Sequence, residues 1–222
     1  MSSRVSRRRF MAGGSGLAAS LIGSARAQEK ANPARGRVDV EGLVEDLKRA
    51  GKGADGQPAV RAVLERAVSE PGALLAGIGE PREAGIHTLY HAPDLTILDV
   101  VWAPLMVLLP HNHKMWATIG IYTGREDNIF WRRLPGANDG TIEAAGAKAL
   151  SVRDAAPLGR DIIHSVTNPI PRLTGALHVY GGDFFDIARS QWDPETLAEV
   201  PYSIERAMRV FEEANARSAP SS

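Results

Sequence analysis

From Gly85 to Tyr180 the sequence consists of short stretches rich in β-branched, aliphatic and aromatic residues, separated by Gly, Pro, Asn and Asp. Eight such stretches occur, over residues 87–90, 96–102, 106–109, 115–122, 128–133, 146–152, 162–166 and 174–180. Short strands divided by turn residues are typical of antiparallel sandwiches and barrels. We therefore predict an all-β domain over residues 85–190.

Both flanks of this region have apolar residues at helical spacing. Residues 38–50, 58–70 and 203–216 each place apolar side chains three or four positions apart, which is the pattern of a helix with one apolar face. The pair Pro71-Gly72 is expected to end the second helix. We predict that residues 28–84 form an N-terminal helical segment packed on the barrel, and that residues 191–222 hold one helix and a flexible tail.

The first 27 residues have the pattern of an export signal. A basic stretch, Arg7-Arg8-Arg9 before Phe10, precedes a short apolar run, and the small-x-small sequence Ala25-Arg26-Ala27 follows. Paired arginines in this position are typical of twin-arginine export. The apolar run is shorter than the ~20 residues that span a bilayer. We predict export by the twin-arginine machinery, cleavage after Ala27, a periplasmic location and no stable membrane span.

Composition excludes several classes of site. The chain has no cysteine, so disulfides and thiolate ligands are ruled out, and a metal would need His, Asp, Glu or backbone oxygen ligands. Residues 1–27 hold five arginines and no acid, which leaves 21 basic and 26 acidic residues in the remainder. This mildly acidic body does not have the basic surface that nucleic acid requires.

Three histidines form the clearest candidate site. His111 and His113 follow Pro110 at the end of an apolar stretch, and residues two apart on a strand point to the same side. A His-x-His pair alone is weak evidence, because a surface pair is the commoner explanation. His164 follows in a second stretch, which runs from the turn at Pro157 to Asn168. A third imidazole would complete a metal site.

These two stretches resemble the conserved motifs of the cupin superfamily. The first motif supplies His111 and His113 and ends at a glycine that Gly124 matches, and the second supplies His164. The resemblance implies a cupin double-stranded β-helix, or jelly-roll, barrel with flanking helices. It also implies that the three histidines are ligands of one divalent metal ion.

Many cupins add a glutamate four or five residues after the second histidine, but Ala117 and Thr118 occupy those positions here. Three neutral imidazoles leave coordination positions open for substrate and dioxygen, and such sites suit Fe(II). Zn(II) accepts three histidines too, so the ligand types do not select the metal. We expect Fe(II), with Zn, Mn and Ni as the alternatives.

A narrower resemblance is to the thiol dioxygenases, the cysteine dioxygenase-like group. That group has a His-x-Tyr sequence on a later strand, which His178 and Tyr180 match. The resemblance implies that both side chains line the iron site as catalytic residues. Ala176 replaces the serine that usually precedes this sequence.

The arginine that grips the substrate carboxylate in the thiol dioxygenases is not evident on an early strand. His91, Arg132, Arg133 and Arg172 remain as alternatives that the sequence does not separate.

Other polar residues have simpler interpretations. We expect Glu126 and Asp127 to lie in a solvated turn, Asn168 to cap a turn, and His87 and His91 to be structural. The remaining hypotheses are that Trp116 forms a pocket wall and that Asp183 and Asp186 orient an imidazole ligand.

The leading functional hypothesis is an Fe(II)-dependent dioxygenase that oxidises a small molecule, for which a thiol is one candidate. The alternatives are a metal-binding cupin that holds a small molecule without turnover, and a Zn or Mn isomerase or hydrolase.

Overall fold

The computed structural model describes residues 36–53 and 56–218. The expected export signal lies outside these residues. The helices are α1 (Val40–Gly51), α2 (Gly56–Ser69), α3 (Pro71–Ile78) and α4 (Ile204–Ser218). The strands are β1 (Gly85–Ala92), β2 (Leu95–Trp102), β3 (Val107–Asn112), β4 (Ala117–Thr123), β5 (Arg125–Arg133), β6 (Ile142–Ser151), β7 (Ala155–Leu158), β8 (Ile163–Thr167), β9 (Thr174–Tyr180), β10 (Ser190–Trp192) and β11 (Glu199–Pro201).

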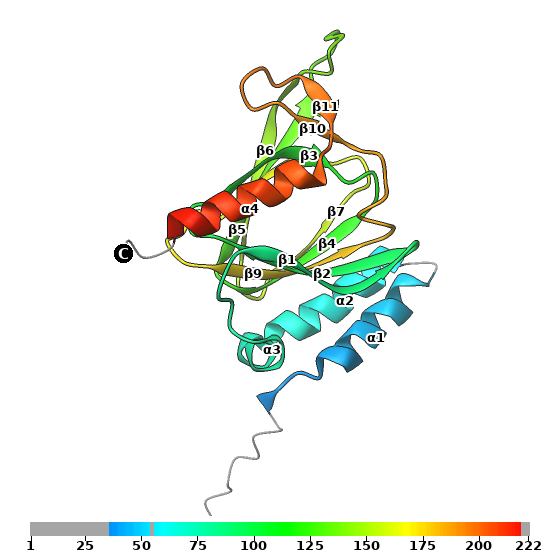
Figure 1. The fold of residues 1–222 in the computed structure, drawn as a ribbon. Coiled ribbons are helices and arrows are strands. Elements are labelled where there is room, and N and C mark those ends of the chain that lie inside the picture. The colour runs from blue at the N-terminus through cyan, green and yellow to red at the C-terminus, as the bar shows by residue number, and fades with distance from the viewer. Residues whose placement is uncertain (1–35, 54–55, 219–222) are drawn as a thin grey trace, which may run out of the picture. The chain divides into compact units, whose positions relative to one another are not determined.

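The strands form two antiparallel sheets that face each other (Figure 1). One has the order β1-β2-β9-β4-β7, and the other has the order β11-β10-β3-β8-β5-β6. Strands β2 to β9 thus form two four-stranded halves, with the orders β2-β9-β4-β7 and β3-β8-β5-β6. The chain crosses repeatedly from one half to the other. This interleaving defines a jelly roll. The all-β double-stranded β-helix, or jelly-roll, architecture expected from the sequence is confirmed by this strand order.

The central strands β2, β9 and β4 of the five-stranded sheet are buried on both faces because helices cover their outer side. Leu47, Leu64 and Leu74 from the first three helices form one cluster with Leu177 and Val179 of β9. The alternate residues of β9, Ala176 and Tyr180, belong instead to the cluster between the sheets. The N-terminal helices therefore pack on the outer face of the five-stranded sheet. The space between the two sheets is filled by other residues.

The C-terminal helix α4 contacts the interior cluster directly. Ala207, Phe211 and Ala214 are buried with residues of both sheets, and the ring of Phe211 stacks on Trp102 at 5.4 Å between centroids. Figure 1 shows α4 running across the opening between the two sheets. This helix therefore covers one opening between the two sheets.

Three features of the fold differ from the prediction. The second helix ends at Ser69, just before Pro71, as expected, but Pro71 then begins a third helix that was not predicted. In the first turn of a helix the missing N–H of proline costs nothing. The short strand β7 contains Pro157 and was read as a turn; it lies at a sheet edge, where proline is tolerated. The segment after residue 190 adds β10 and β11 as well as one helix.

In the part of the chain that the structure describes, no helix combines the length and the hydropathy needed to cross a bilayer.

Gly124 joins β4 to β5 at a position that only glycine fits. Its φ of +78° is in the left-handed region, and a Cβ atom would lie 2.1 Å from Oγ1 of Thr174. That hydroxyl accepts the backbone N–H of Arg125 at 2.9 Å. A side chain at Gly124 would therefore strain the backbone and displace this hydrogen bond.

We predict that Gly124→Ala lowers the free energy of unfolding by about 1–3 kcal/mol or more, measured by urea denaturation, since backbone strain of this kind costs that amount. Gly146→Ala is the matched control, because a Cβ atom there meets nothing within 4 Å. Equal stabilities of the two variants would contradict the conclusion that only glycine fits at position 124.

Candidate metal centre

Strands β3 and β8 bring three imidazoles together inside the barrel. His111 lies directly opposite His164 in the ladder, and His113 follows the end of β3. The Nε2 atom of His113 is 3.2 Å from Nε2 of His111 and 3.2 Å from Nε2 of His164. All three side chains are at most 5 % exposed. The structure thus places the three histidines that the sequence singled out in one buried cluster.

Two of the imidazoles are fixed with Nε2 facing the centre. The Nδ1–H group of His111 donates to the carbonyl of Leu109 at 2.9 Å, and that of His164 donates to Oδ1 of Asn128 at 2.7 Å. In a neutral imidazole, Nε2 then carries a lone pair. The Nδ1 atom of His113 has no hydrogen-bond partner among the described residues.

A metal ion satisfies the lone pairs of the three facing Nε2 atoms better than hydrogen bonds between the imidazoles do. His113 can donate one Nε2–H group at most, so it cannot satisfy the lone pairs of His111 and His164 together. A single metal ion can accept all three lone pairs, and imidazole nitrogen suits Fe, Zn, Cu and Ni. The donor set is therefore that of a three-histidine metal centre.

Electrostatics keep these imidazoles neutral. Burial lowers the pKa of His111 to about 4, and the positive charge of Arg189 acts in the same direction. Burial also holds the pKa of His113 and of His164 well below the usual range, and the neighbouring imidazoles add to the effect. Neutral imidazole is the form that binds a metal.

His178 and Tyr180 lie beside the cluster, on the inner side of β9. The ring of Tyr180 meets that of His113 edge to face at 5.0 Å between centroids. Nδ1 of His178 is 3.1 Å from the Tyr180 hydroxyl. The two side chains share one face of β9, as their spacing predicts, while Leu177 and Val179 pack toward the helices.

Glu126 occupies the middle of this polar region and corrects the sequence interpretation. It was expected in a solvated turn, but it is fully buried on the inner side of β5. Its carboxylate accepts Nε1–H of Trp102 at 2.8 Å and Nδ2–H of Asn128 at 3.0 Å. Nε2 of His178 lies 3.2 Å from the same carboxylate.

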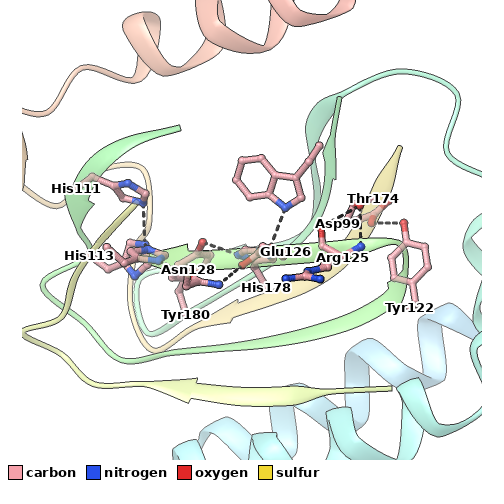
Figure 2. A network of polar contacts seen from close by, with 12 residues as sticks. Asp99, His111, His113, Tyr122, Arg125, Glu126, Asn128, Thr174, His178 and Tyr180 are labelled. Atoms are coloured by element: carbon pink, nitrogen blue, oxygen red, sulfur yellow. Dashed lines mark hydrogen bonds and ion pairs between the residues drawn. The ribbon is translucent and has the colours of Figure 1, made fainter. Parts of the chain in front are cut away.

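The polar groups therefore form one directed chain, most of which Figure 2 shows. His164 donates to Asn128, and Asn128 donates to Glu126. From the other side, the Tyr180 hydroxyl donates to Nδ1 of His178, whose Nε2–H group donates to Glu126. Every donor points toward the carboxylate, so one anion orients both a metal-facing histidine and the His-Tyr pair.

Hydrogen bonds keep this carboxylate ionised. Burial acts to raise the pKa of Glu126, but the hydrogen bonds from His178, Asn128 and Trp102 outweigh it and lower the pKa. Burial raises the pKa of the Tyr180 hydroxyl, which therefore remains a neutral donor.

The four side chains considered as carboxylate-binding groups lie outside the centre. His91 pairs with Asp183 at 2.8 Å, and Arg132 pairs with Glu143 at 2.8 Å. Arg133 pairs with Glu199, and Arg172 is exposed. Asp183 therefore does not orient a metal-facing imidazole, which corrects that hypothesis.

Three further expectations have structural outcomes. Asp186 is exposed, and its backbone N–H donates to Asp183, so the structure gives no contact between it and an imidazole of the cluster. Asn168 bonds the carbonyls of Ala103 and Arg172 in a loop. Trp116 lines an open cavity of about 330 Å³.

Comparisons with known proteins were made by sequence and by structure. No protein-family model and no curated protein matches the sequence. Solved structures that are similar include a Klebsiella pneumoniae protein with a double-stranded β-helix domain, at 14% identity and a TM-score of 0.38 over 51% of this chain and 90% of that one.

A second similar structure is a cupin family protein from Methanocaldococcus jannaschii, at 9% identity and a TM-score of 0.39 over 47% and 84% of the two chains. A third is a mutant of Bacillus subtilis oxalate decarboxylase, at 13% identity and 0.38 over 50% and 29%. At such TM-scores these similarities carry no argument about function, and the jelly-roll assignment rests on the strand order.

We predict that His111→Ala removes the bound metal while the fold is retained, because two imidazoles alone bind more weakly than three. Metal content after dialysis, measured by atomic emission, checks this, and circular dichroism checks the fold. His91→Ala is the matched control, since that imidazole is exposed and pairs with Asp183. Full metal occupancy in His111→Ala would remove His111 from the ligand set.

We also predict that the metal-free protein loses stability as the pH falls from 6.5 to about 4. The unfolded chain protonates His111 near pH 6.5, whereas the folded chain does so only near pH 4, so protons favour unfolding between these values. The slope contributed by this histidine is at most about 1.4 kcal/mol per pH unit. Urea titrations at several pH values measure how the free energy of unfolding depends on pH. His111→Gln should show a smaller slope than the wild type, and identical slopes would contradict the prediction.

Proposed function

We propose that the protein is a non-haem Fe(II)-dependent dioxygenase that oxidises a small molecule, for which a thiol is the first candidate. The observation that carries the proposal is the ligand set, which has three neutral imidazoles. The buried carboxylate of Glu126, which is linked to His164 through Asn128, is engaged with Asn128, Trp102 and His178. Fe(II) held by His111, His113 and His164 would supply the redox chemistry with dioxygen, and three-ligand sites with open positions are typical of such enzymes.

The residues around the ligands have definable tasks in this reaction. Tyr180 offers a neutral hydroxyl next to the His113 ring. His178 accepts from that hydroxyl and donates to Glu126, so a proton released by a substrate near Tyr180 has a hydrogen-bonded route toward a buried anion. Positioned groups of this kind contribute to catalysis through proton transfer.

The barrel interior shields the three histidines from bulk solvent. The ring centroid of Phe184 lies 6.3 Å from that of His113, and Phe184 belongs with Met106, Leu108 and the α4 residue Phe211 to the hydrophobic cluster between the sheets. A dry site strengthens electrostatic interactions and protects reactive species from side reactions. Both properties favour reaction with dioxygen at the three histidines.

A thiolate is a balanced substrate for such a site. When both atoms of dioxygen are transferred to sulfur, the thiolate becomes a sulfinate, sulfur loses four electrons and dioxygen gains four. No further reductant is needed. The protein therefore has only to bind the substrate, orient it and transfer its proton.

The cellular location is also a proposal. Arg7-Arg8-Arg9 and the Ala25-Arg26-Ala27 sequence support twin-arginine export and a periplasmic site of action. That route carries folded proteins, which agrees with a metal loaded before export.

We predict that the protein, loaded anaerobically with Fe(II), consumes dioxygen when a suitable small thiol is added, and that His111→Ala does not. An oxygen electrode and mass spectrometry of the sulfinate product make the measurement. Bound iron without thiol-dependent uptake across a panel of small thiols would contradict the thiol proposal and favour a metal-binding cupin without this activity.

Tyr180→Phe should retain iron but lose at least about tenfold in turnover, because it removes the hydroxyl through which a substrate proton would reach His178 without changing the ring. Steady-state oxygen uptake and iron content, measured on the same sample, check this. Unchanged turnover would remove Tyr180 from the site.

A further inference from the structure

The three histidines of the metal centre are nearly closed off from solvent. His111, His113 and His164 are each at most 5 % exposed. The void that touches His111 measures about 10 Å³, which is room for about one water molecule. A substrate of several heavy atoms therefore reaches the centre only if a neighbouring side chain moves aside.

An open cavity of about 330 Å³ adjoins the centre along two parts of the chain. Residues 114–116 line this cavity and directly follow His113, and residues 181–183 line it and directly follow Tyr180. The rings of His113 and Tyr180 meet at 5.0 Å between centroids, so both parts of the cavity wall lead back to the same side of the centre. A cavity of this volume is in the range that holds small molecules in proteins.

Phe184 lies between this cavity and the centre. Its neighbours in sequence on both sides, Asp183 and Asp186, line the cavity, whereas the side chain of Phe184 is buried and 5 % exposed. The centroid of its ring lies 4.4 Å from that of Tyr180 and 6.3 Å from that of His113. The ring therefore occupies the space through which the cavity would connect with the histidines.

Side-chain contacts hold Phe184 in this place, since residues 181–189 join β9 to β10 without a helix or strand. The backbone N–H of Phe184 donates to Oγ1 of Thr96 at 3.2 Å, and that hydroxyl donates to the carbonyl of Gly182 at 2.8 Å. The guanidinium carbon of Arg189 is 4.1 Å from the ring centroid of Phe184, which favours the closed position. Contacts of this kind can break and re-form without disturbing either sheet, as in loops that open over other active sites.

The cover on the other side, helix α4, is anchored more firmly. Ala207 borders the void at His111, and Phe211 is buried between the sheets. The side-chain amide of Asn215 exchanges two hydrogen bonds with the backbone of Ala84, at 2.8 and 2.9 Å. Opening this side would lift a whole helix and expose its apolar face to water, which costs more than turning one ring on a loop. Entry past Phe184 is therefore favoured.

We propose that Phe184 is the gate between the 330 Å³ cavity and the metal centre, and that its ring limits the size of the molecules that reach the metal. This inference deepens the proposed function, because it names a residue that selects the substrate. The gate itself requires only the cavity and the three histidines. Small, unbranched molecules should pass when the ring turns aside, whereas bulky ones should need the ring removed.

The test measures how fast reagents in solution acylate each histidine of the full-length protein without metal. Diethyl pyrocarbonate acylates neutral imidazole, and tandem mass spectrometry of peptides gives a rate for each residue. His87 is exposed and serves as the internal reference. Burial holds the pKa of His113 well below the usual range, so at about pH 7.5 a slow reaction there reports access and not protonation. In the wild type, His113 should react at least about a hundredfold more slowly than His87, because it waits for a local opening.

Phe184→Ala should raise the rate at His113 at least about tenfold, because the opening is then no longer needed. Phe211→Ala is the matched control. It removes the same ring from the α4 side of the same hydrophobic cluster, and it should leave the rate at His113 unchanged. Dibenzyl pyrocarbonate reacts in the same way but is bulkier. Its rate at His113 relative to that of diethyl pyrocarbonate should rise in Phe184→Ala and stay as in the wild type in Phe211→Ala.

Four results would each overturn the proposal: His113 reacts as fast as His87 in the wild type, Phe184→Ala leaves the rate at His113 unchanged, Phe211→Ala raises that rate as much or more, or the relative rate of the bulky reagent does not change in Phe184→Ala.

Circular dichroism checks the fold of each variant. If an alanine variant does not fold, Phe184→Leu and Phe211→Leu are compared in the same way. A rise of at least about threefold at His113 is then expected for Phe184→Leu alone, and equal rates in the two leucine variants overturn the proposal. Because the protein holds no metal and no turnover is measured, a failure of dioxygen uptake leaves this result intact, and a failure here leaves the proposed function intact.

Discussion

The buried carboxylate of Glu126 is the constraint on which the rest of the site depends. An ionised carboxylate without partners would not be tolerated inside the barrel, so Trp102, Asn128 and His178 must direct N–H groups to it. Because Nδ2 of Asn128 donates to Glu126, Oδ1 of the same amide faces His164. This fixes the form of His164 that carries its proton on Nδ1 and leaves Nε2 facing the other histidines. The orientation of a metal-facing imidazole and that of the His178–Tyr180 pair thus have a common cause.

The jelly roll supplies the geometry for this arrangement. Inner-face positions of β2, β5 and β9 bring Trp102, Glu126 and His178 together although they lie far apart in the sequence. The outer face of β9 packs on the N-terminal helices, which holds the strand rigidly. Side chains mounted on rigid strands keep catalytic distances better than side chains on loops.

The sequence alone predicted much of the fold and one part of the site. Strand alternation and the His-x-His spacing are local patterns, so the barrel and the convergence of His111 with His113 could be read from them. Glu126 was misread because Gly124-Arg125-Glu126-Asp127 is locally polar and resembles a turn. Its partners are distant in sequence, and only strand pairing shows that β5 turns it inward.

Arg189 was missed for a related reason. It follows no motif, and its importance comes from the rings of Phe184 and Tyr202 that hold it beside the histidines. Arg189 lies on the segment that enters β10, and its Nη1 atom is buried without a hydrogen-bond partner among the described residues. Such a placement is a property of the folded chain, so no local pattern could reveal it.

Three imidazoles should hold the metal while Glu126 stays outside the ligand set, separated from His164 by Asn128. X-ray absorption spectroscopy of the Fe(II)-loaded protein tests this directly, because multiple scattering counts imidazole ligands. We predict three imidazole ligands in the wild type and the same three in Glu126→Gln. Fewer than three in the wild type, or a changed light-atom shell in Glu126→Gln that shows a lost carboxylate ligand, would contradict it.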